Sequence, residues 1–474
     1  MFNLREELFN STWFILSNII HFHLFLISLI FYIVLCMNMQ QRLERASLAA
    51  SRMLSLETEV KNSALACIAQ GLRENRDKIF YANQLDLTAA RQNGLAIPLL
   101  RRLEFDKKKL DDVLLGIRDI LALPDPAGKV LEARLLDDGL ILKRVSCPIG
   151  LIAMIFESRP DALVQMASLA VKSGNAIVLK GGSEANESNK VLATIIARAG
   201  EEKGLPSDWL TLLETREEVG ELLAFDKYVD LVIPRGSKEF VSKIKAESRI
   251  PVLGHSDGIC HVYVHEDADP VMAIKIVLDS KIQYPAACNA AEVLLVHAAF
   301  AHRSLMALLQ ALSKAGVMLD VCEKAAQILD KDPGQTRNLH YSVKTDKDWA
   351  VEYLDMRMAV KIVYSLDEAI AHINHYGSSH TDAIVCASSE AANRFLKEVD
   401  SASVYHNAST RFADGYRYGL GAEVGISTSK IHARGPMGLE GLCTYKWLLE
   451  GYGHIVSDYA SGERHFVHKE LPPN

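Results

Sequence analysis

The residues around Cys288 have the types and spacing that a nucleophilic cysteine needs. Cys288 lies in the segment YPAACNAAEVLLVH, from Tyr284 to His297, between small side chains and directly before an apolar strand pattern. Small neighbours leave room for a substrate carbonyl to reach the sulfur, and a following backbone N–H can stabilise the oxyanion that forms. A buried, inert cysteine is the alternative, because cysteine is among the most buried residue types. Cys288 is therefore a candidate nucleophile, and Asn289 beside it is a second candidate catalytic residue.

Two glycine-containing turns follow apolar strand patterns and can approach a phosphate. They are Lys180-Gly181-Gly182-Ser183 and Pro234-Arg235-Gly236-Ser237. Glycines at the end of a parallel strand let the backbone amides of the next helix come close to a phosphate group, although such a turn is often only a turn. No G-x-G-x-x-G is present, since GLGAEVG from Gly419 has Val424 at the third glycine, and no P-loop supports phosphoryl transfer.

The elements that must position these residues alternate between strand and helix. Apolar strand patterns are followed by helical patterns that end at Gly174 and Gly204, and Thr215 to Glu218 has the spacing of a capping box. The predicted strands are 149–156, 175–180, 209–213, 229–234 and 292–297, and the predicted helices are 160–173 and 186–203. This alternation predicts a parallel sheet with helices on both faces, which is a candidate nucleotide-binding unit.

Length and composition indicate a globular chain of two or three domains. The chain has 474 residues, 49% of them hydrophobic and 23% charged, values close to globular averages. Its formal net charge of −7 gives no global electrostatic footprint for nucleic acid. The eight cysteines are scattered without a CxxC pair, which favours a reduced, cytoplasmic protein.

Neither the cysteines nor the histidines predict a metal site. The cysteine spacing does not close a zinc site. His372, His375 and His380 are close in sequence, but they straddle the end of a helical pattern and a Gly-Ser turn. We expect these histidines to be structural or exposed, and we expect no metal.

The N-terminal extension, residues 1–38, differs from the rest of the chain. Trp13 to Cys36 is an apolar run longer than the roughly 20 residues that span a bilayer. Residues 12–36 therefore either form a membrane anchor, with the C-terminal part in the cytoplasm, or belong to an upstream extension of a chain that starts at Met37 or Met39. From Met39 onward the pattern is that of an amphipathic helix.

Several long segments resemble one enzyme family. They are CPIGLIAMIFESRPDALVQMASLAVKSGNAIVLKGGSEA, VDLVIPRGS, PVLGHSDGICHVYV, YPAACNAAEVLLVH, VYSLDEAIAHINHYGSSHTDAI and NASTRFADGYRYGLGAEVGISTSKIHARGPMGLEGL. Together they resemble the γ-glutamyl phosphate reductases, a branch of the aldehyde dehydrogenase superfamily that also forms the C-terminal half of bifunctional pyrroline-5-carboxylate synthases. The resemblance runs in order from about Met39 to Asp458.

The resemblance implies an α/β, aldehyde-dehydrogenase-like fold in three parts. These parts are a Rossmann-like cofactor domain, an α/β catalytic domain and a small oligomerisation ribbon. Their expected boundaries are 39–126 and 147–250 for the NADPH-binding domain, 251–442 for the catalytic domain, 127–146 and 443–460 for the ribbon, and 461–474 for a tail. The ribbon implies a homo-oligomer.

The reaction implied is the NADPH-dependent reduction of L-glutamyl 5-phosphate to L-glutamate 5-semialdehyde and phosphate, in proline biosynthesis. Cys288 would form a thioester, and its backbone amide with Ser158 would hold the oxyanion. Acid-producing relatives place a general-base Glu in an E-L-G-G segment, whereas Val252 occupies that position here. The absence of this base suits reduction. A separate glutamate 5-kinase would supply the acyl phosphate.

The resemblance also implies roles for the turns and for several charged residues. Lys180 would bind the adenosine ribose, and Ser183 in place of a Glu would favour NADPH over NADH. The remaining candidate cofactor contacts are Gly181, Gly182, Gly236 and Ser237, and the candidate substrate-binding residues are Arg159, Arg411, Glu423 and Arg434. Two alternatives remain open at this point: a CoA-dependent semialdehyde dehydrogenase, and a membrane-tethered binding protein without turnover.

Overall fold

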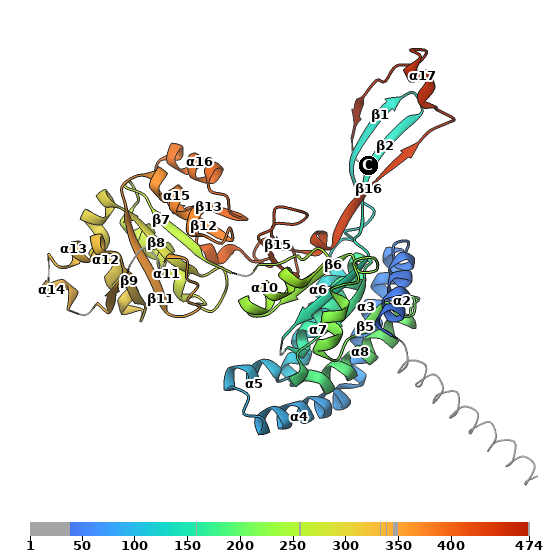
Figure 1. Cartoon of the computed structure of the whole chain (residues 1–474), viewed down its shortest axis with the longest axis horizontal. Helices are drawn as coiled ribbons and strands as arrows, with labels where there is room; N and C mark the ends of the chain where they lie inside the picture. The colour runs from blue at the N-terminus through green and yellow to red at the C-terminus, as the bar shows by residue number, and fades with distance from the viewer. Residues whose placement is uncertain are drawn as a thin grey trace, which may run out of the picture.

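The computed structural model describes residues 38–472 except 158, 256, 332, 338 and 345–348 (Figure 1). The predicted N-terminal apolar segment 12–36 and the candidate oxyanion residue Ser158 therefore lie outside the described residues. Among the helices of the described part, none is both long enough and apolar enough to cross a membrane.

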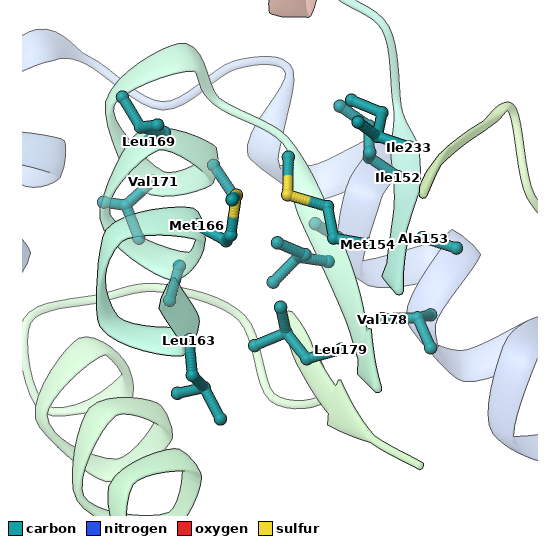
Figure 2. Packing of buried hydrophobic residues seen from close by; sticks show 14 of the residues in the cluster. Ile152, Ala153, Met154, Leu163, Met166, Leu169, Val171, Val178, Leu179 and Ile233 are labelled. Carbon is teal, nitrogen blue, oxygen red and sulfur yellow. The ribbon is translucent and has the colours of Figure 1, made fainter. Parts of the chain in front are cut away.

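A four-stranded parallel sheet forms the core of the first lobe. Its strand order is β5-β4-β3-β6. These strands are β3 (Leu151–Phe156), β4 (Ala176–Lys180), β5 (Leu210–Leu212) and β6 (Leu231–Arg235). Figure 2 shows Leu163 and Met166 of α7 (Pro160–Ser173) packing against Met154 and Leu179 of the sheet. Because β3 and β4 are buried along their whole length, they read in the sequence as continuous apolar runs.

Local sequence signals set the ends of the helices in this lobe. α7 begins at Pro160 and ends before Gly174, whose φ of 77° is the left-handed conformation that glycine adopts without strain. The side chain of Thr215 accepts a hydrogen bond from the Glu218 amide, and the Glu218 carboxylate accepts one from the Thr215 backbone amide, which confirms the predicted capping box. The remaining helices of this lobe are α2 (Met39–Met53), α3 (Thr58–Glu74), α4 (Arg76–Gln92), α5 (Ile97–Leu103), α6 (Lys107–Ala122), α8 (Asn186–Glu201), α9 (Arg216–Leu222) and α10 (Lys238–Glu247).

A seven-stranded sheet with only parallel neighbours forms the second lobe, in the order β10-β9-β11-β8-β7-β12-β13. The strands are β7 (Cys260–Val264), β8 (Ala291–His297), β9 (Met318–Val321), β10 (Tyr341–Val343), β11 (Arg357–Val363), β12 (Thr381–Val385) and β13 (Ser403–His406). Its helices are α11 (Pro270–Ile282), α12 (Ala298–Lys314), α13 (Glu323–Leu329), α14 (Pro333–Thr336), α15 (Leu366–Tyr376) and α16 (Ser389–Glu398), and they lie around the sheet in Figure 1. The segment that follows Cys288 is β8, the middle strand of the seven. The predicted α/β class is confirmed.

An antiparallel ribbon projects away from both lobes (Figure 1). Its order is β16-β2-β1-β17, built from β1 (Val130–Asp137), β2 (Leu140–Pro148), β16 (Cys443–Glu450) and β17 (Lys469–Leu471). β17 pairs with β1 inside the segment expected to be a tail, so that this segment contributes to the ribbon. A short pair, β14 (Gly425–Ser427) and β15 (Gly435–Met437), lies between the lobes and the ribbon.

Candidate active site

The turn that carries Cys288 is held by two close backbone contacts. It connects α11 to β8 and packs against Gly258, where an added Cβ would lie 2.1 Å from the Cys288 carbonyl oxygen. Any other residue at position 258 would displace this turn. The thiol of Cys260, at the start of β7, donates to the same carbonyl oxygen at 3.2 Å. Both contacts fix the backbone of the nucleophile rather than its sulfur.

Cys288 lies on the wall of a cavity of about 660 Å³ between the two lobes. The cavity is lined by residues of β6 and α10 from the first lobe. The turn of Cys288, the segments that follow α10 and β10, and residues of β14 and β15 complete the lining. Its polar lining includes Arg235, Ser237, Lys238, His255, Asp257, Glu352 and Glu423. The cysteine is half-buried, so that its sulfur is not sealed in the core.

The surroundings of Cys288 keep the thiol protonated when no ligand is bound. Burial raises its pKa to about 12, and the Glu423 carboxylate adds to this effect. The guanidinium of Arg235 acts in the opposite direction. Activation of the thiol therefore requires a change in the cavity, such as the arrival of ligands that exclude water and shift the charge balance.

Arg235 is a functional candidate to which sequence reasoning assigned no role. It ends β6, and one guanidinium nitrogen donates to the Val424 carbonyl at 2.8 Å. This bond aims the side chain into the cavity of Cys288. In the turn Pro234 to Ser237 only the glycine and the serine were predicted to have a role. The turn also carries Arg235, the cation that lowers the pKa of the Cys288 thiol most.

Two of the carboxylates that line the cavity of Cys288 accept hydrogen bonds from backbone amides. Glu423, a predicted substrate-binding residue, accepts a hydrogen bond from the Gly415 amide at 2.8 Å. Glu352 accepts one from the Gly258 amide at 2.9 Å, and the sequence contains no signal for it. Burial raises the pKa of both groups. Asp257 and Glu239 are the other acidic residues of this lining, and Val252, at the expected base position, is not part of it.

The structure brings only some of the predicted substrate-binding arginines close to Cys288. Arg411 is 8% exposed, donates to Gln283 at 2.9 Å and is near enough to act on the thiol's pKa. Arg159 pairs with Asp161 at 2.6 Å. Arg434 pairs with Asp400 at 2.9 Å and lines a different cavity, beside β16. Its position does not fit the predicted contact with the same substrate.

Asn289 is used structurally. Its side chain is 4% exposed, and its NH2 group donates to the Ala413 carbonyl at 2.7 Å. The bond ties the turn of Cys288 to the segment that carries Arg411. Asn289 is not part of the cavity lining, so its amide positions the turn and does not face the reacting atoms.

The predicted adenosine-ribose residues lie in a second cavity, of about 500 Å³. Lys180, Gly181, Gly182 and Ser183 all line it. Five further charged residues that were not predicted join them. Two are cations and three are carboxylates: Arg216, Lys243, Glu157, Glu184 and Glu247. Burial lowers the pKa of Lys180, while Glu184 acts against this shift.

Helix α10 separates the two cavities. Its first residues, with Gly236 and Ser237, line the cavity of Cys288, whereas Phe240, Lys243 and Glu247 line the second. Ser237 is the N-cap of α10, and its hydroxyl accepts from the Phe240 amide at 3.4 Å. The N-terminus of a helix favours anions. A molecule with a central pyrophosphate can thus pass this helix end and reach both cavities.

The three histidines considered as a metal cluster are separated by the fold. His372 is buried against Trp349 and Tyr376, and His375 is exposed at the end of α15. His380 is fully buried and faces His255, with ring centroids 4.9 Å apart. One ring nitrogen of His255, one ring nitrogen of His380 and the Cys288 sulfur all lie within 4.8 Å of one another. Sequence reasoning missed this grouping because the three residues come from separate segments.

Comparison with known proteins places the chain in a family. The sequence model of the aldehyde dehydrogenase family matches residues 121–328. The γ-glutamyl phosphate reductase of Pelotomaculum thermopropionicum is 53% identical over 435 residues, which are 92% of this chain and 98% of that protein. That of Acetivibrio thermocellus is 54% identical over 423 residues, 89% of this chain and 96% of that protein.

A solved structure agrees with the sequence relatives. The crystal structure of γ-glutamyl phosphate reductase from Thermotoga maritima superposes with a TM-score of 0.84 at 38% identity, covering 88% of this chain and 99% of that chain. The fold, the family model and these relatives define an oxidoreductase of the aldehyde dehydrogenase class. Within that class the chain belongs to the γ-glutamyl phosphate reductases, enzymes of proline biosynthesis.

Proposed function

We propose that the chain reduces L-glutamyl 5-phosphate to L-glutamate 5-semialdehyde and phosphate with NADPH, through a thioester on Cys288. The observation that carries the proposal is the shared cavity of Cys288, Arg235 and the N-terminus of α10. In this cavity a nucleophile and a cation lie beside a helix N-terminus that can bind an anion.

The first half-reaction needs a thiolate and little acid assistance, because phosphate is a good leaving group. The Cys288 sulfur attacks the acyl carbon, the bond from that carbon to the phosphate oxygen breaks, and the thiol proton leaves with the phosphate. Arg235 stabilises the thiolate, since its charge lowers the thiol's pKa, and it can pair with the phosphate as it departs. Arg411 acts on the thiol in the same sense.

The residues around the two cavities fit NADPH by charge. Bound NADPH supplies the hydride that takes the thioester to the aldehyde level. Ser237 and Gly236 would lie at its pyrophosphate, and Lys180, Arg216 and Lys243 provide three cations for a 2′-phosphate in the second cavity. Three glutamates, Glu157, Glu184 and Glu247, line the same cavity and would repel that phosphate, so the preference for NADPH depends on the phosphate lying nearer to the cations than to these carboxylates.

Protection of the thioester from water is the second requirement for reduction. Glu352 and Glu423 line the cavity, but each accepts a hydrogen bond from a backbone amide. These bonds hold the carboxylates in place, and the apolar Val252 occupies the position of the usual base. We propose that this arrangement disfavours activation of a hydrolytic water and commits the thioester to reduction.

Two partners complete the proposal. The acyl phosphate is labile and would come from a separate glutamate 5-kinase, because the chain carries no P-loop motif. A second copy of the chain would bind along β16, which exposes Tyr445, Trp447, Leu448 and Leu449.

The test is an assay of NADPH oxidation by the purified chain with glutamate, ATP and glutamate 5-kinase. We expect oxidation that depends on all three and that is slower with NADH. Oxidation that also occurs with an acyl-CoA in place of the kinase mixture would instead indicate a CoA-dependent dehydrogenase. Absence of oxidation with every acyl donor would contradict the proposal and favour a binding protein without turnover.

A further inference from the structure

The three side chains around the sulfur of Cys288 form a set of metal-ligating atoms. One ring nitrogen of His255, one of His380 and the Cys288 sulfur all lie within 4.8 Å of one another. A tetrahedral Zn2+ with bonds of about 2.0–2.3 Å requires ligand atoms about 3.3–3.6 Å apart. The three groups therefore need shifts of roughly 1 Å, which small rotations of the side chains supply.

The imidazole of His255 is oriented by a backbone carbonyl. Nδ1 of His255 lies 2.9 Å from the Ile426 carbonyl, which can only accept, so the proton sits on Nδ1 and the lone pair on Nε2. A backbone carbonyl behind a ligating histidine is the usual second support of a metal site.

His380 provides an independent sign of a missing partner. It is fully buried, and its Nδ1 lies 2.9 Å from the Thr381 hydroxyl and 3.6 Å from the Cys260 sulfur. Its Nε2 has no hydrogen-bond partner within the described part of the chain. A buried polar atom without a partner is costly, and an ion bound there would remove that cost.

The two glutamates near the cluster offset the two arginines, so the surrounding charges do not exclude a cation. Arg235 and Arg411 lower the pKa of the Cys288 thiol. Glu423 and Glu352 raise it. The thiolate then adds one negative charge at the metal. Soft sulfur and two imidazoles favour Zn2+ over Mg2+, which prefers oxygen ligands.

We propose that Cys288, His255 and His380 bind a thiophilic divalent cation such as Zn2+, and that this ion inhibits the enzyme reversibly. Binding replaces the thiol proton: the S–H bond breaks, the S–Zn bond forms and one proton is released to solvent. A water molecule takes the fourth position, as in open zinc sites. The bond to the metal withdraws electron density from the sulfur, and the ion occupies space that the acyl group must enter, so the thiolate is a weaker and less accessible nucleophile. The inhibition rests on the proposed function of Cys288, whereas the binding does not.

Equilibrium dialysis of the chelator-treated full chain against Zn2+ tests the binding without any turnover. We expect one ion to be lost on the substitution Cys288→Ser, and at least tenfold weaker binding of that ion on His380→Asn and on His255→Asn. The matched control is His302→Gln, which removes an exposed histidine of α12 and leaves the affinity unchanged. Mg2+ in excess should not compete. Zinc affinity that is unchanged in Cys288→Ser, or in both active-site histidine variants, would overturn the proposal.

Co2+ in place of Zn2+ identifies the sulfur directly. We expect a thiolate-to-Co2+ charge-transfer band in the near ultraviolet that is absent in Cys288→Ser and present in His302→Gln. A Co2+ complex without this band would contradict ligation by the cysteine. In the turnover assay, Zn2+ should abolish NADPH oxidation and a chelator should restore it. An enzyme that turns over equally well with bound Zn2+ refutes the inhibition, whereas an enzyme inactive without any metal would contradict the proposed function instead.

Discussion

The two cavities on either side of α10 are built in different ways. The cavity of Lys180 is formed by the first lobe alone and contains three cations and no nucleophile. The cavity of Cys288 lies between the lobes and combines a thiol, a buried cation and several carboxylates. In the Lys180 cavity three glutamates offset the three cations, whereas in the Cys288 cavity four carboxylates outnumber two cations. We expect cofactor binding to depend on the Lys180 cavity and activation of the nucleophile on the Cys288 cavity. Substitutions in one cavity should therefore leave the role of the other unchanged.

Loss of the nucleophile should abolish the reaction in the Cys288 cavity and leave cofactor binding in the Lys180 cavity unchanged. We expect Cys288→Ala to reduce NADPH oxidation by about 10⁴-fold or more, because the thioester cannot form. The dissociation constant of NADPH, measured by fluorescence titration, should stay within about twofold. Residual turnover within tenfold of the original chain would show that another group carries the acyl transfer.

Displacement of the Cys288 turn should have the next largest effect. We expect Gly258→Ala to lower kcat by about 10²-fold, because the added Cβ forces the turn away and a shift of about 1 Å misplaces the sulfur. Thermal unfolding should show a loss of about 1–3 kcal/mol. The control is Gly116→Ala in α6, where an added Cβ meets nothing within 4 Å and should stabilise the helix slightly. Equal kcat values in both variants would contradict the close approach.

These two residues also show what the sequence could and could not predict. The small neighbours of Cys288 and the apolar strand after it made this residue a candidate, and the family resemblance assigned it the role of nucleophile. The boundaries of α7 were predicted from Pro160 and Gly174. Gly258 carries no local signal, since its constraint is a carbonyl oxygen thirty residues further along the chain. Glu352 and His380 likewise reach the cavity only through tertiary packing.

The predictions were most complete where neighbouring residues share a cavity. Lys180 to Ser183 lie together because they end one strand. Arg434 was grouped with Arg411 by residue type alone, and the fold sends its guanidinium to Asp400 instead. The strand β17 was missed because three residues with two charges, Lys469 to Leu471, lack an apolar alternation.

The raised pKa of the Cys288 thiol predicts how its reactivity depends on pH. Because the pKa of Cys288 is raised to about 12, the reactive thiolate is a small fraction that grows about tenfold per pH unit below that value. The rate of alkylation of Cys288 by iodoacetamide, followed by peptide mass spectrometry, should therefore rise about tenfold from pH 7 to 8 and again from 8 to 9. A rate that levels off below pH 8 would mean that the ligand-free thiol is already activated.

The smallest effect is expected in the Lys180 cavity, which Arg216 also lines. We expect Arg216→Gln to raise the KM for NADPH about fivefold, which corresponds to about 1 kcal/mol for one charged contact to the 2′-phosphate. The KM for NADH and kcat should not change, because neither depends on that phosphate. Equal increases in KM for both cofactors, in initial-rate measurements, would place Arg216 away from the 2′-phosphate.

Formation of the acyl-enzyme tests the central claim most directly. The chain is mixed with glutamate, ATP and glutamate 5-kinase without NADPH, quenched in acid, digested and analysed by mass spectrometry. The account predicts a glutamyl adduct on the peptide that contains Cys288, and its disappearance when NADPH is added before the quench. An adduct on another cysteine, or full NADPH oxidation by a chain that never carries an adduct, would contradict it.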